Sequence, residues 1–210
     1  MAHHLRLEKG CQMFDMLFGE SYEEKFESIK LNLPGKHNVE NAIASMAVVS
    51  MLGGQFDDII KAVASFEGVQ RRFDQYQFSG LVYIDDYAHH PEEVKATLLA
   101  IRNLYPDQKI TVVFQPHLFS RTRDFADEFA QSLSLADELI LLEIYPAREK
   151  PINGIDSKML LSKVQLVSKR LMTKEALLDD LKINHRSVLV TLGAGDIDQL
   201  VEPIKSIYQE

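Results

Sequence analysis

Residues 81–93 read LVYIDDYAHHPEE, an apolar run that ends in two acids, an aromatic residue and two histidines. The run 81–84 predicts a buried strand, and Pro91 is typical of the first position of a helix. Glu92 and Glu93 are favourable in the first turn of that helix. Polar side chains that follow a strand of an open α/β sheet lie at its carboxyl end, where such sheets bind ligands. The segment therefore predicts a strand–helix unit with a site at the junction.

The same alternation of apolar strands and amphipathic helices continues to the end of the chain. The predicted strands are 75–78, 81–84, 110–115, 139–144, 166–168 and 188–192. The predicted helices are 91–104, 124–134, 156–163, 173–182 and 197–208. The first two strands are expected to form a hairpin, and the alternation that follows predicts a doubly wound, mostly parallel α/β sheet.

The N-terminal third has a different pattern and little predicted core. It predicts strands at 5–8, 11–18 and 26–33 and helices at 39–52 and 56–66. Asn38 is expected to cap the first of these helices. Residues 1–4, MAHH, are interpreted as a tag remnant or a truncation start and are left out of the site. This third resembles the tail of one domain, joined by a linker at 68–73 to a second domain.

Composition limits the classes of function. The 210 residues carry a formal charge of -8, which argues against a protein that holds nucleic acid through its phosphates. The single cysteine, Cys11, excludes an intrachain disulfide and suits a reducing cytosol. No apolar run is long enough to span a membrane. A cytoplasmic protein that binds neither nucleic acid nor membrane is predicted.

Two segments near the predicted linker have open interpretations. In 34–42, PGKHNVENA, a helix cap alone would explain Asn38 but not Asn41 one turn later. The two amides could instead read the edge of a base, with His37 against a ring or a sugar, although the spacing alone favours the structural interpretation. The adjacent Arg71 and Arg72 are either solvated or a clamp for phosphates, with nothing in the pattern to decide between them.

Three strand-end segments could carry chemistry. In 85–91 the acids could accept hydrogen bonds from ribose or hold a hydrated Mg²⁺, and the histidines could transfer protons. A zinc site there is weakly supported, because no Cys or further His follows at a regular spacing. In 114–124 an anion site is predicted at Arg121, whereas Arg123 is expected to pair with Asp124 or Asp127. The GAGD turn at 193–196 follows the last strand rather than the first, so it is interpreted as a tight turn with an Asp cap.

Taken in order, five motifs resemble one family. They are LPGKHNVENA at 33–42, GVQRRF at 68–73, DDYAHHP at 85–91, QPH at 115–117 with Arg121-Thr122, and GAGD at 193–196. The combination is specific and is similar to the Mur ligases of peptidoglycan synthesis over residues 5–210. Within the family, it resembles the branch that joins L-alanine to UDP-N-acetylmuramate.

The resemblance implies a domain organisation. Residues 1–72 would be the end of a central α/β ATPase domain, and residues 73–210 the C-terminal Rossmann-like domain that takes the incoming amino acid. The sequence holds no G-x-x-x-x-G-K-[ST] phosphate loop. The domain that binds the UDP-sugar and the Mg²⁺-binding residues of the central domain are also missing. The chain is therefore expected to be a fragment without ligase turnover of its own.

The resemblance also implies the site residues. Those implied to contact ATP are His37, Asn38 and Asn41 at the adenine, Arg71 or Arg72, and Asp86 at the ribose. Those implied to face L-alanine and the acyl phosphate are His89, His90, His117 and Arg121. Of these, His89, His90 and Arg121 are the candidates for catalysis, and His90, His117 and Arg121 are the candidates for substrate contacts.

Two positions depart from the family pattern. Leu118 stands where some relatives carry a basic residue. Ala88 stands where other Mur ligases carry a lysine, whose contact cannot be made here.

The implied reaction has two steps. ATP, with Mg²⁺ held mainly by the missing part, phosphorylates the carboxylate of UDP-N-acetylmuramate, and the amine of L-alanine then displaces phosphate. A ligase that joins an intact tripeptide to the same sugar ranks second, because such relatives tend to show Glu-Pro-Arg at 115–117. A non-catalytic binding module for nucleotides or amino acids is a further alternative. A dehydrogenase is disfavoured by the place of the glycine turn, and no obligate protein partner is expected.

Overall fold

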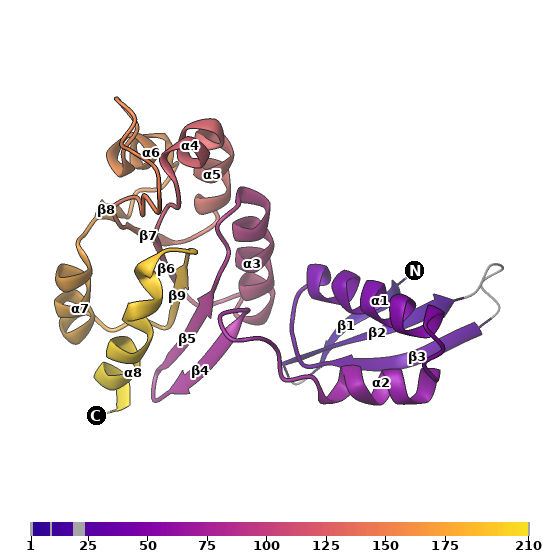
Figure 1. Ribbon diagram of the computed structural model, residues 1–210. Coiled ribbons are helices and arrows are strands. Elements are labelled where there is room, and N and C mark those ends of the chain that lie inside the picture. The colour runs from indigo at the N-terminus through magenta and orange to yellow at the C-terminus, as the bar shows by residue number, and fades with distance from the viewer. Residues whose placement is uncertain (1, 9, 19–23, 210) are drawn as a thin grey trace. The chain divides into compact units, whose positions relative to one another are not determined.

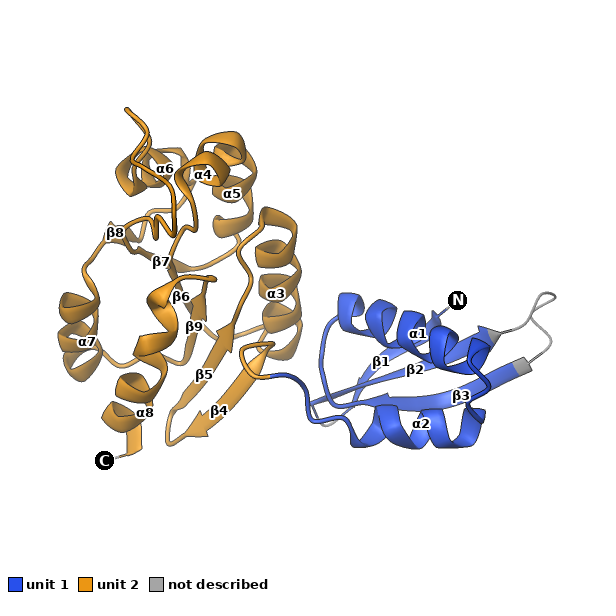
Figure 2. Cartoon of the chain, viewed as in Figure 1, with its two compact units in different colours: residues 1–69 blue, residues 70–210 orange. Residues whose placement is uncertain are grey.

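The chain divides into two compact units. In this computed structural model residues 2–8, 10–18 and 24–209 are described. The units are Met1–Val69 and Gln70–Glu210 (Figure 2). This division falls close to the expected domain boundary between residues 72 and 73, which stays a prediction.

The first unit is a three-stranded antiparallel sheet with two helices. Its strands, in the order β1-β2-β3, are β1 Ala2–Glu8, β2 Cys11–Phe18 and β3 Glu24–Leu31. Its helices are α1 Lys36–Met51 and α2 Phe56–Ser65. Its buried core consists of Phe14, Met16, Ile29, Leu31, Val39, Met46 and Ile59. The strands and helices expected from the sequence are present, with ends that differ by a few residues.

One expectation for this unit is wrong, and one element is longer than expected. Strand β1 begins at Ala2 rather than at residue 5, and the His4 ring nitrogen Nδ1 lies 2.9 Å from the Asp15 carboxylate. Asn38 does not cap α1, because the helix begins at Lys36, after Gly35 with its φ of 103°. The Asn38 side-chain amide instead donates to the Pro34 carbonyl at 2.7 Å. A glycine at positive φ allows the chain to turn into the helix earlier than the capping pattern suggested.

The second unit is built on a six-stranded sheet in the order β4-β5-β9-β6-β7-β8 (Figure 1). Its strands are β4 Asp74–Phe78, β5 Leu81–Asp86, β6 Ile110–Phe114, β7 Glu138–Leu141, β8 Lys169–Leu171 and β9 Val188–Leu192. Its helices are α3 Pro91–Leu104, α4 Phe119–Asp124, α5 Ala126–Leu133, α6 Ser157–Lys163, α7 Lys174–Ile183, the 3-10 helix η1 Asp196–Leu200 and α8 Val201–Gln209. Only the β4–β5 pair is antiparallel among the described strands of this sheet. The prediction of a doubly wound, mostly parallel sheet is confirmed.

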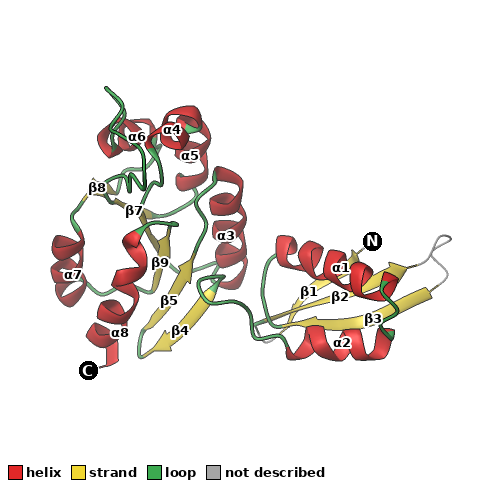
Figure 3. Ribbon diagram, viewed as in Figure 1, coloured by secondary structure: helices red, strands yellow, loops and turns green. Residues whose placement is uncertain are grey.

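Both faces of this sheet are covered, which is why its central strands are apolar throughout. One core packs against α3, α5 and α6, and includes Ile84, Val112, Phe114 and Leu139 from the strands. The other core packs against α7, η1 and α8, and includes Tyr83 from β5. Figure 3 shows the helices on the two sides of the strands. No helix in the described part of the chain is long and apolar enough to cross a membrane.

Several element ends in the second unit differ from the prediction. Strand β5 extends through Asp85 and Asp86, because both carboxylates find partners inside the fold. The helix expected at 124–134 is α5, Ala126–Leu133, and the short helix α4 before it was not expected. The strand expected at 166–168 lies at Lys169–Leu171, and the last helix begins as the 3-10 helix η1. Helix α3 and strand β9 have the predicted bounds.

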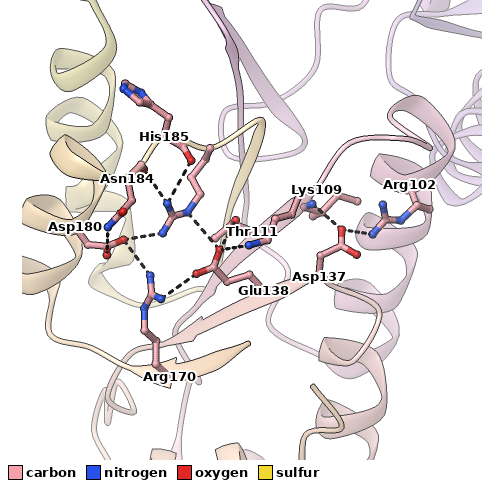
Figure 4. A network of polar contacts seen from close by, with 11 residues as sticks. Arg102, Lys109, Thr111, Asp137, Glu138, Arg170, Asp180, Asn184 and His185 are labelled. Atoms are coloured by element: carbon pink, nitrogen blue, oxygen red, sulfur yellow. Dashed lines mark hydrogen bonds and ion pairs between the residues drawn. The ribbon is translucent and has the colours of Figure 1, made fainter. Parts of the chain in front are cut away.

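The amino end of the sheet carries a charged network, drawn in Figure 4. Its centre is Glu138 on β7, which is 3% exposed. Its carboxylate lies 3.1 Å from the nitrogens of both Lys109 and Arg170 and 3.4 Å from the Arg186 guanidinium. The same two arginines contact Asp180 on α7, at 3.1 Å and 2.7 Å. The network joins two strands, a helix and the segments before β6 and β9 at the end of the sheet opposite the candidate site.

Candidate functional site

The candidate site lies at the carboxyl ends of β5, β9 and β6, which are neighbours in the sheet. The chain leaves β5 and β6 toward α3 and α4, and leaves β9 toward η1 and α8, whose side chains pack in the opposite core. Adjacent strands whose connections lead to opposite faces leave a crevice at their carboxyl ends. The segments 85–91, 115–123 and 193–196 therefore meet at one edge, as the sequence predicts.

Asp85 is a buried structural anion, with 1% of its surface exposed. Its Oδ1 accepts from the Thr191 hydroxyl at 2.6 Å, and its Oδ2 lies 2.9 Å from Arg71 Nε. The Thr191 hydroxyl also contacts the Tyr83 hydroxyl at 2.8 Å. Burial raises the pKa of Tyr83. These contacts hold the ends of β5 and β9 together and leave Asp85 no free face.

Asp86 joins the start of the second unit to the strand-end loop. Its two carboxylate oxygens accept backbone N–H groups, from Phe73 at 2.9 Å and from Ala88 at 2.7 Å. Burial raises the pKa of Asp86 to about 6, although these two N–H groups favour the ionised form. The contact with ribose stays a prediction, and the side chain as it stands fixes the 86–88 loop.

The two histidines of the motif have different surroundings. His90 is the N-cap of α3: its Nδ1 accepts the Glu92 N–H at 3.4 Å, and the Glu93 carboxylate accepts the His90 N–H at 3.2 Å. The His90 ring also lies edge-on to Phe125, with ring centres 4.8 Å apart. His89 points elsewhere, with its ring centre 6.0 Å from that of His117. The geometry therefore brings His89, rather than His90, to the other side chains of the site.

His117 and Arg121 complete this group. The Arg121 guanidinium donates to the His89 carbonyl at 3.5 Å, and both His117 and Arg121 are partly exposed. Burial lowers the pKa of His117, and the positive charge of Arg121 lowers it further. His117 is thus kept neutral beside a cation, and its buried Nδ1 has no hydrogen-bond partner among the described residues.

Helix α4 holds Arg121 in place through the loop after β7. Leu118 has a φ of 70° and donates its N–H to the Tyr145 carbonyl at 2.9 Å. The Glu149 carboxylate accepts the Ser120 N–H at 2.9 Å and also contacts the Ser120 hydroxyl. These contacts keep the pKa of Glu149 below its ordinary value. An anion at a helix N-terminus is favourable, so Glu149 fixes the first turn of the helix that carries Arg121. Arg123 pairs with Asp124 at 2.7 Å on the surface, as expected.

The adjacent arginines Arg71 and Arg72 also have different contacts. The guanidinium of Arg71 is engaged by Asp85 and by the Gly193 carbonyl, at 2.9 and 2.7 Å. The guanidinium of Arg72 lies 5.5 Å from the centre of the Tyr87 ring and is exposed, with no hydrogen bond among the described residues. Arg72 is therefore the arginine whose donors remain available for a ligand.

The glycine turn differs from the prediction in one respect. Asp196 is not a helix cap, since it is the first residue of η1 and Gly195 occupies the cap position without a side-chain bond. The Asp196 carboxylate contacts Gln115 Nε2 at 2.8 Å and Lys174 Nζ at 2.6 Å. Sequence patterns did not single out Lys174, because its partner Asp196 lies 22 residues away along the chain.

An open depression of about 280 Å³ lies beside this turn. Its walls come from the ends of β6 and β7, from the start of α7 and from the turn. The polar residues that line it include Gln115, Tyr145, Thr173, Lys174 and Asp196.

The described residues do not fit a Mg²⁺ site. No group of three His, Cys, Asp or Glu side chains among them is placed to hold a metal ion. The most suitable carboxylates, Asp85 and Asp86, already have both oxygens engaged within the fold. No step of the chemistry is therefore assigned to a metal held by this unit.

The predicted adenine contacts belong to the first unit. His37, Asn38 and Asn41 lie in the first turns of α1, and Asn41 is exposed. Their role stays a prediction.

Comparison with known proteins gives the family. Residues 71–195 match the family model described as Mur ligase, glutamate ligase domain. The chain is 49% identical over 211 residues to the UDP-N-acetylmuramate–L-alanine ligase of Flavobacterium psychrophilum, covering 100% of this chain and 46% of that protein. It is 47% identical over 210 residues to the ligase of the same name from Flavobacterium johnsoniae, with the same coverage.

A solved structure agrees. The crystal structure of UDP-N-acetylmuramate-alanine ligase MurC from Thermotoga maritima superposes with a TM-score of 0.75 at 28% identity, covering 99% of this chain and 45% of that one. The chain thus spans about half the length of the relatives it matches. With the match to the family model over more than half of its residues, the ordered motifs and the sheet edge that gathers them, this chain belongs to the Mur ligase family.

Proposed function

We propose that this chain acts as the C-terminal part of an ATP-dependent ligase that adds L-alanine to UDP-N-acetylmuramate in bacterial peptidoglycan synthesis. The observation that carries the proposal is the convergence of His89, His117 and Arg121 on the carboxyl edge of the sheet. The names of relatives that are 47–49% identical support the choice of L-alanine.

The proposed roles follow from charge and access. Arg121 binds the carboxylate of L-alanine, because a guanidinium gives two parallel donors to a carboxylate. His117, held neutral, accepts a hydrogen bond from the amino group, and His89 lies beside it. His90 contributes by fixing the start of α3. Holding the amine in position lets it attack the acyl phosphate made from ATP and the muramyl carboxylate, and phosphate then leaves.

For ATP, Arg72 is the proposed contact rather than Arg71, whose guanidinium is engaged inside the fold. The adenine contacts proposed for His37, Asn38 and Asn41 and the ribose contact proposed for Asp86 rest on the family resemblance. Mg²⁺ and the phosphate loop are proposed to come from protein that this chain does not include.

A chimaera tests the proposal. In the Flavobacterium psychrophilum ligase, this chain replaces the matching segment. We expect phosphate release that requires ATP, UDP-N-acetylmuramate and L-alanine together, whereas the 210-residue chain alone releases none. A preference of the chimaera for a tripeptide over L-alanine would favour the recycling ligase instead, and turnover by the isolated chain would contradict its proposed dependence on the missing part.

A matched pair of variants tests the role of Arg121. Arg121→Gln in the chimaera should lower kcat/KM for L-alanine by roughly 100-fold, as expected for the loss of a charge-assisted pair worth about 2–3 kcal/mol. Arg123→Gln removes the same charge from the same helix, but its partner is Asp124 on the surface, so activity should stay unchanged. Equal effects of the two substitutions would rule out a specific contact by Arg121.

A further inference from the structure

The 193–196 turn is tied to the start of the second unit by its first residue. The Gly193 carbonyl accepts from Arg71 Nη2 at 2.7 Å, and the Gly193 N–H donates to the Asp86 carbonyl at 3.3 Å. The turn therefore sits directly on the strand end that carries the 85–91 motif. Both backbone groups of Gly193 are thus engaged within the fold, so this end of the turn is held by protein.

Its last residue is held from two other directions. Gln115 at the end of β6 donates to the Asp196 carboxylate at 2.8 Å and accepts the Ile197 N–H at 2.9 Å. From the start of α7, Lys174 Nζ lies 2.6 Å from the same carboxylate and donates to the Asp196 carbonyl at 2.8 Å. Lys174 is the one cation among these contacts, and 23% of its side chain is exposed.

The position of Lys174 is costly for its own helix. It is the first residue of α7, after the Thr173 cap. The aligned peptide dipoles make a helix N-terminus positive, so a cation there is unfavourable. The ion pair with Asp196 offsets this cost and, with Gln115, keeps the pKa of the Asp196 carboxyl below its ordinary value against the effect of burial. Lys174 therefore stabilises the 193–196 turn, although its charge is unfavourable for helix α7.

The 193–196 turn also contacts the part of the site proposed to bind the amino acid. A Cβ atom on Gly195 would lie 2.6 Å from Tyr145 Cβ and 2.5 Å from the Gln115 side-chain oxygen, so the turn lies against both residues. The Tyr145 ring stacks on the His117 ring with centres 5.7 Å apart. The backbone of Tyr145 also pairs with Pro116 and Leu118 on either side of His117, at 2.8 and 2.9 Å. A shift of the turn would therefore move the segment that presents His117 and leads into Arg121.

We propose that Lys174 is a positioning residue of the amino-acid half of the site. It acts through Asp196 and Gly195 on Tyr145 and His117, and it does not touch the reacting atoms. The proposal rests on the proposed function for its catalytic meaning, although the physical coupling from Lys174 to His117 can be tested without turnover.

The coupling is measured on the 210-residue chain by NMR. In Lys174→Met, the amide signals of Leu118 and Tyr145 and the ring signals of His117 should shift, and Lys174→Arg should restore them because it keeps the charge. The control is Lys182→Met, in the last turn of the same helix, whose ion pair with Asp179 is exposed. It should leave those signals in place. Unmoved signals in Lys174→Met would overturn the proposal, since a purely local role predicts that result.

The consequence for the reaction is measured in the chimaera. Lys174→Met should raise KM for L-alanine about tenfold while KM for ATP stays constant, as expected for a small displacement of the groups that position one substrate. Equal rises for both substrates, or none, would overturn the proposal. If Lys174→Met does not fold, Asp196→Asn removes the same ion pair and takes its place in both experiments. An inactive unsubstituted chimaera would count against the proposed function, and the NMR result would still decide the coupling.

Discussion

At the scale of single residues, the two adjacent acids at the end of β5, Asp85 and Asp86, have partners of different charge. Side chains of successive strand residues point to opposite faces, so Asp85 and Asp86 meet different neighbours. Asp85 is paired with the Arg71 guanidinium, whereas both partners of Asp86 are neutral backbone N–H groups. Burial raises the pKa of Asp86 to about 6. Ionisation of Asp86 is therefore expected to destabilise the fold.

The pH dependence of the free energy of unfolding tests the effect of Asp86 ionisation. Because the pKa of Asp86 in the folded chain is about 6 and its ordinary value is 3.8, protonation stabilises the fold. That contribution is complete below about pH 4 and is lost as the pH rises through 6, by roughly 3 kcal/mol in all. The free energy of unfolding of the unsubstituted chain relative to Asp86→Asn should therefore fall between pH 4 and pH 7. Urea titrations followed by the amide signals of β5 measure it, and a constant difference would contradict the assignment.

At the scale of elements, the two ends of the sheet serve different purposes. At the carboxyl end, polar groups stay partly exposed around His89, His117 and Arg121. At the amino end, charges are paired among themselves, with Glu138 surrounded by three cations (Figure 4). Burial would raise the pKa of Glu138, but the hydrogen bond and charge of Lys109 and the charge of Arg186 outweigh it, so that the pKa lies below its ordinary value. The amino end fastens strands and helices together and leaves the carboxyl end free to carry the site.

Neutralising Glu138 tests the role of this network. Glu138→Gln leaves Arg186, with only 8% of its side chain exposed, facing a neutral amide. We expect a loss of about 2 kcal/mol in the free energy of unfolding, since the contacts of three cations with a buried carboxylate are lost while Asp180 still pairs with Arg170 and Arg186. Asp179→Asn is the matched control, because its pair with Lys182 is exposed and should contribute little. Urea denaturation of both variants makes the comparison, and similar losses would mean that burial of the network is unimportant.

At the scale of the whole molecule, each unit has a core of its own. Among the described residues, the buried apolar core of the first unit and the two cores of the second share no member. The contacts of Arg71 with Asp74, Asp85 and Gly193 all lie within Gln70–Glu210. These contacts of Arg71 at the sheet edge therefore lie within the second unit.

Separate expression tests this independence. A chain of residues 70–210 should fold cooperatively, and its amide spectrum should overlay that of the full chain for the strands of the six-stranded sheet. A truncation that starts at residue 73 removes Arg71 and should be less stable, because Asp85 then loses its cation inside the fold. Equal stability of the two truncations, measured by urea denaturation, would show that Arg71 does not anchor the sheet edge.

Local patterns determined most of the fold. Apolar runs of strand length and helix-period patterns predicted the strands and helices of the second unit, and Pro91 with Glu93 predicted the start of α3, because these features depend on neighbours a few residues away. Element ends were missed where a distant partner decides them. Asp85 and Asp86 remain in β5 because of Thr191, Arg71 and Phe73, and η1 begins at Asp196 next to Gln115.

The sequence by itself determined the alternating α/β pattern, the family resemblance and the segments that meet at the site. Only the tertiary structure decided which of two adjacent residues, Arg71 or Arg72 and His89 or His90, remains accessible to a ligand. Arg71 is held by Gly193, which is 122 residues away, and Gln115 is held to Asp196 across 81 residues, so no local pattern contains those contacts. His90 differs from His89 for a similar reason, since one ring caps α3 against Phe125 and the other lies toward His117. The physical reason is that helix and strand preferences depend on residues close in sequence. The accessibility, charge pairing and burial of a side chain depend on residues that only folding brings together.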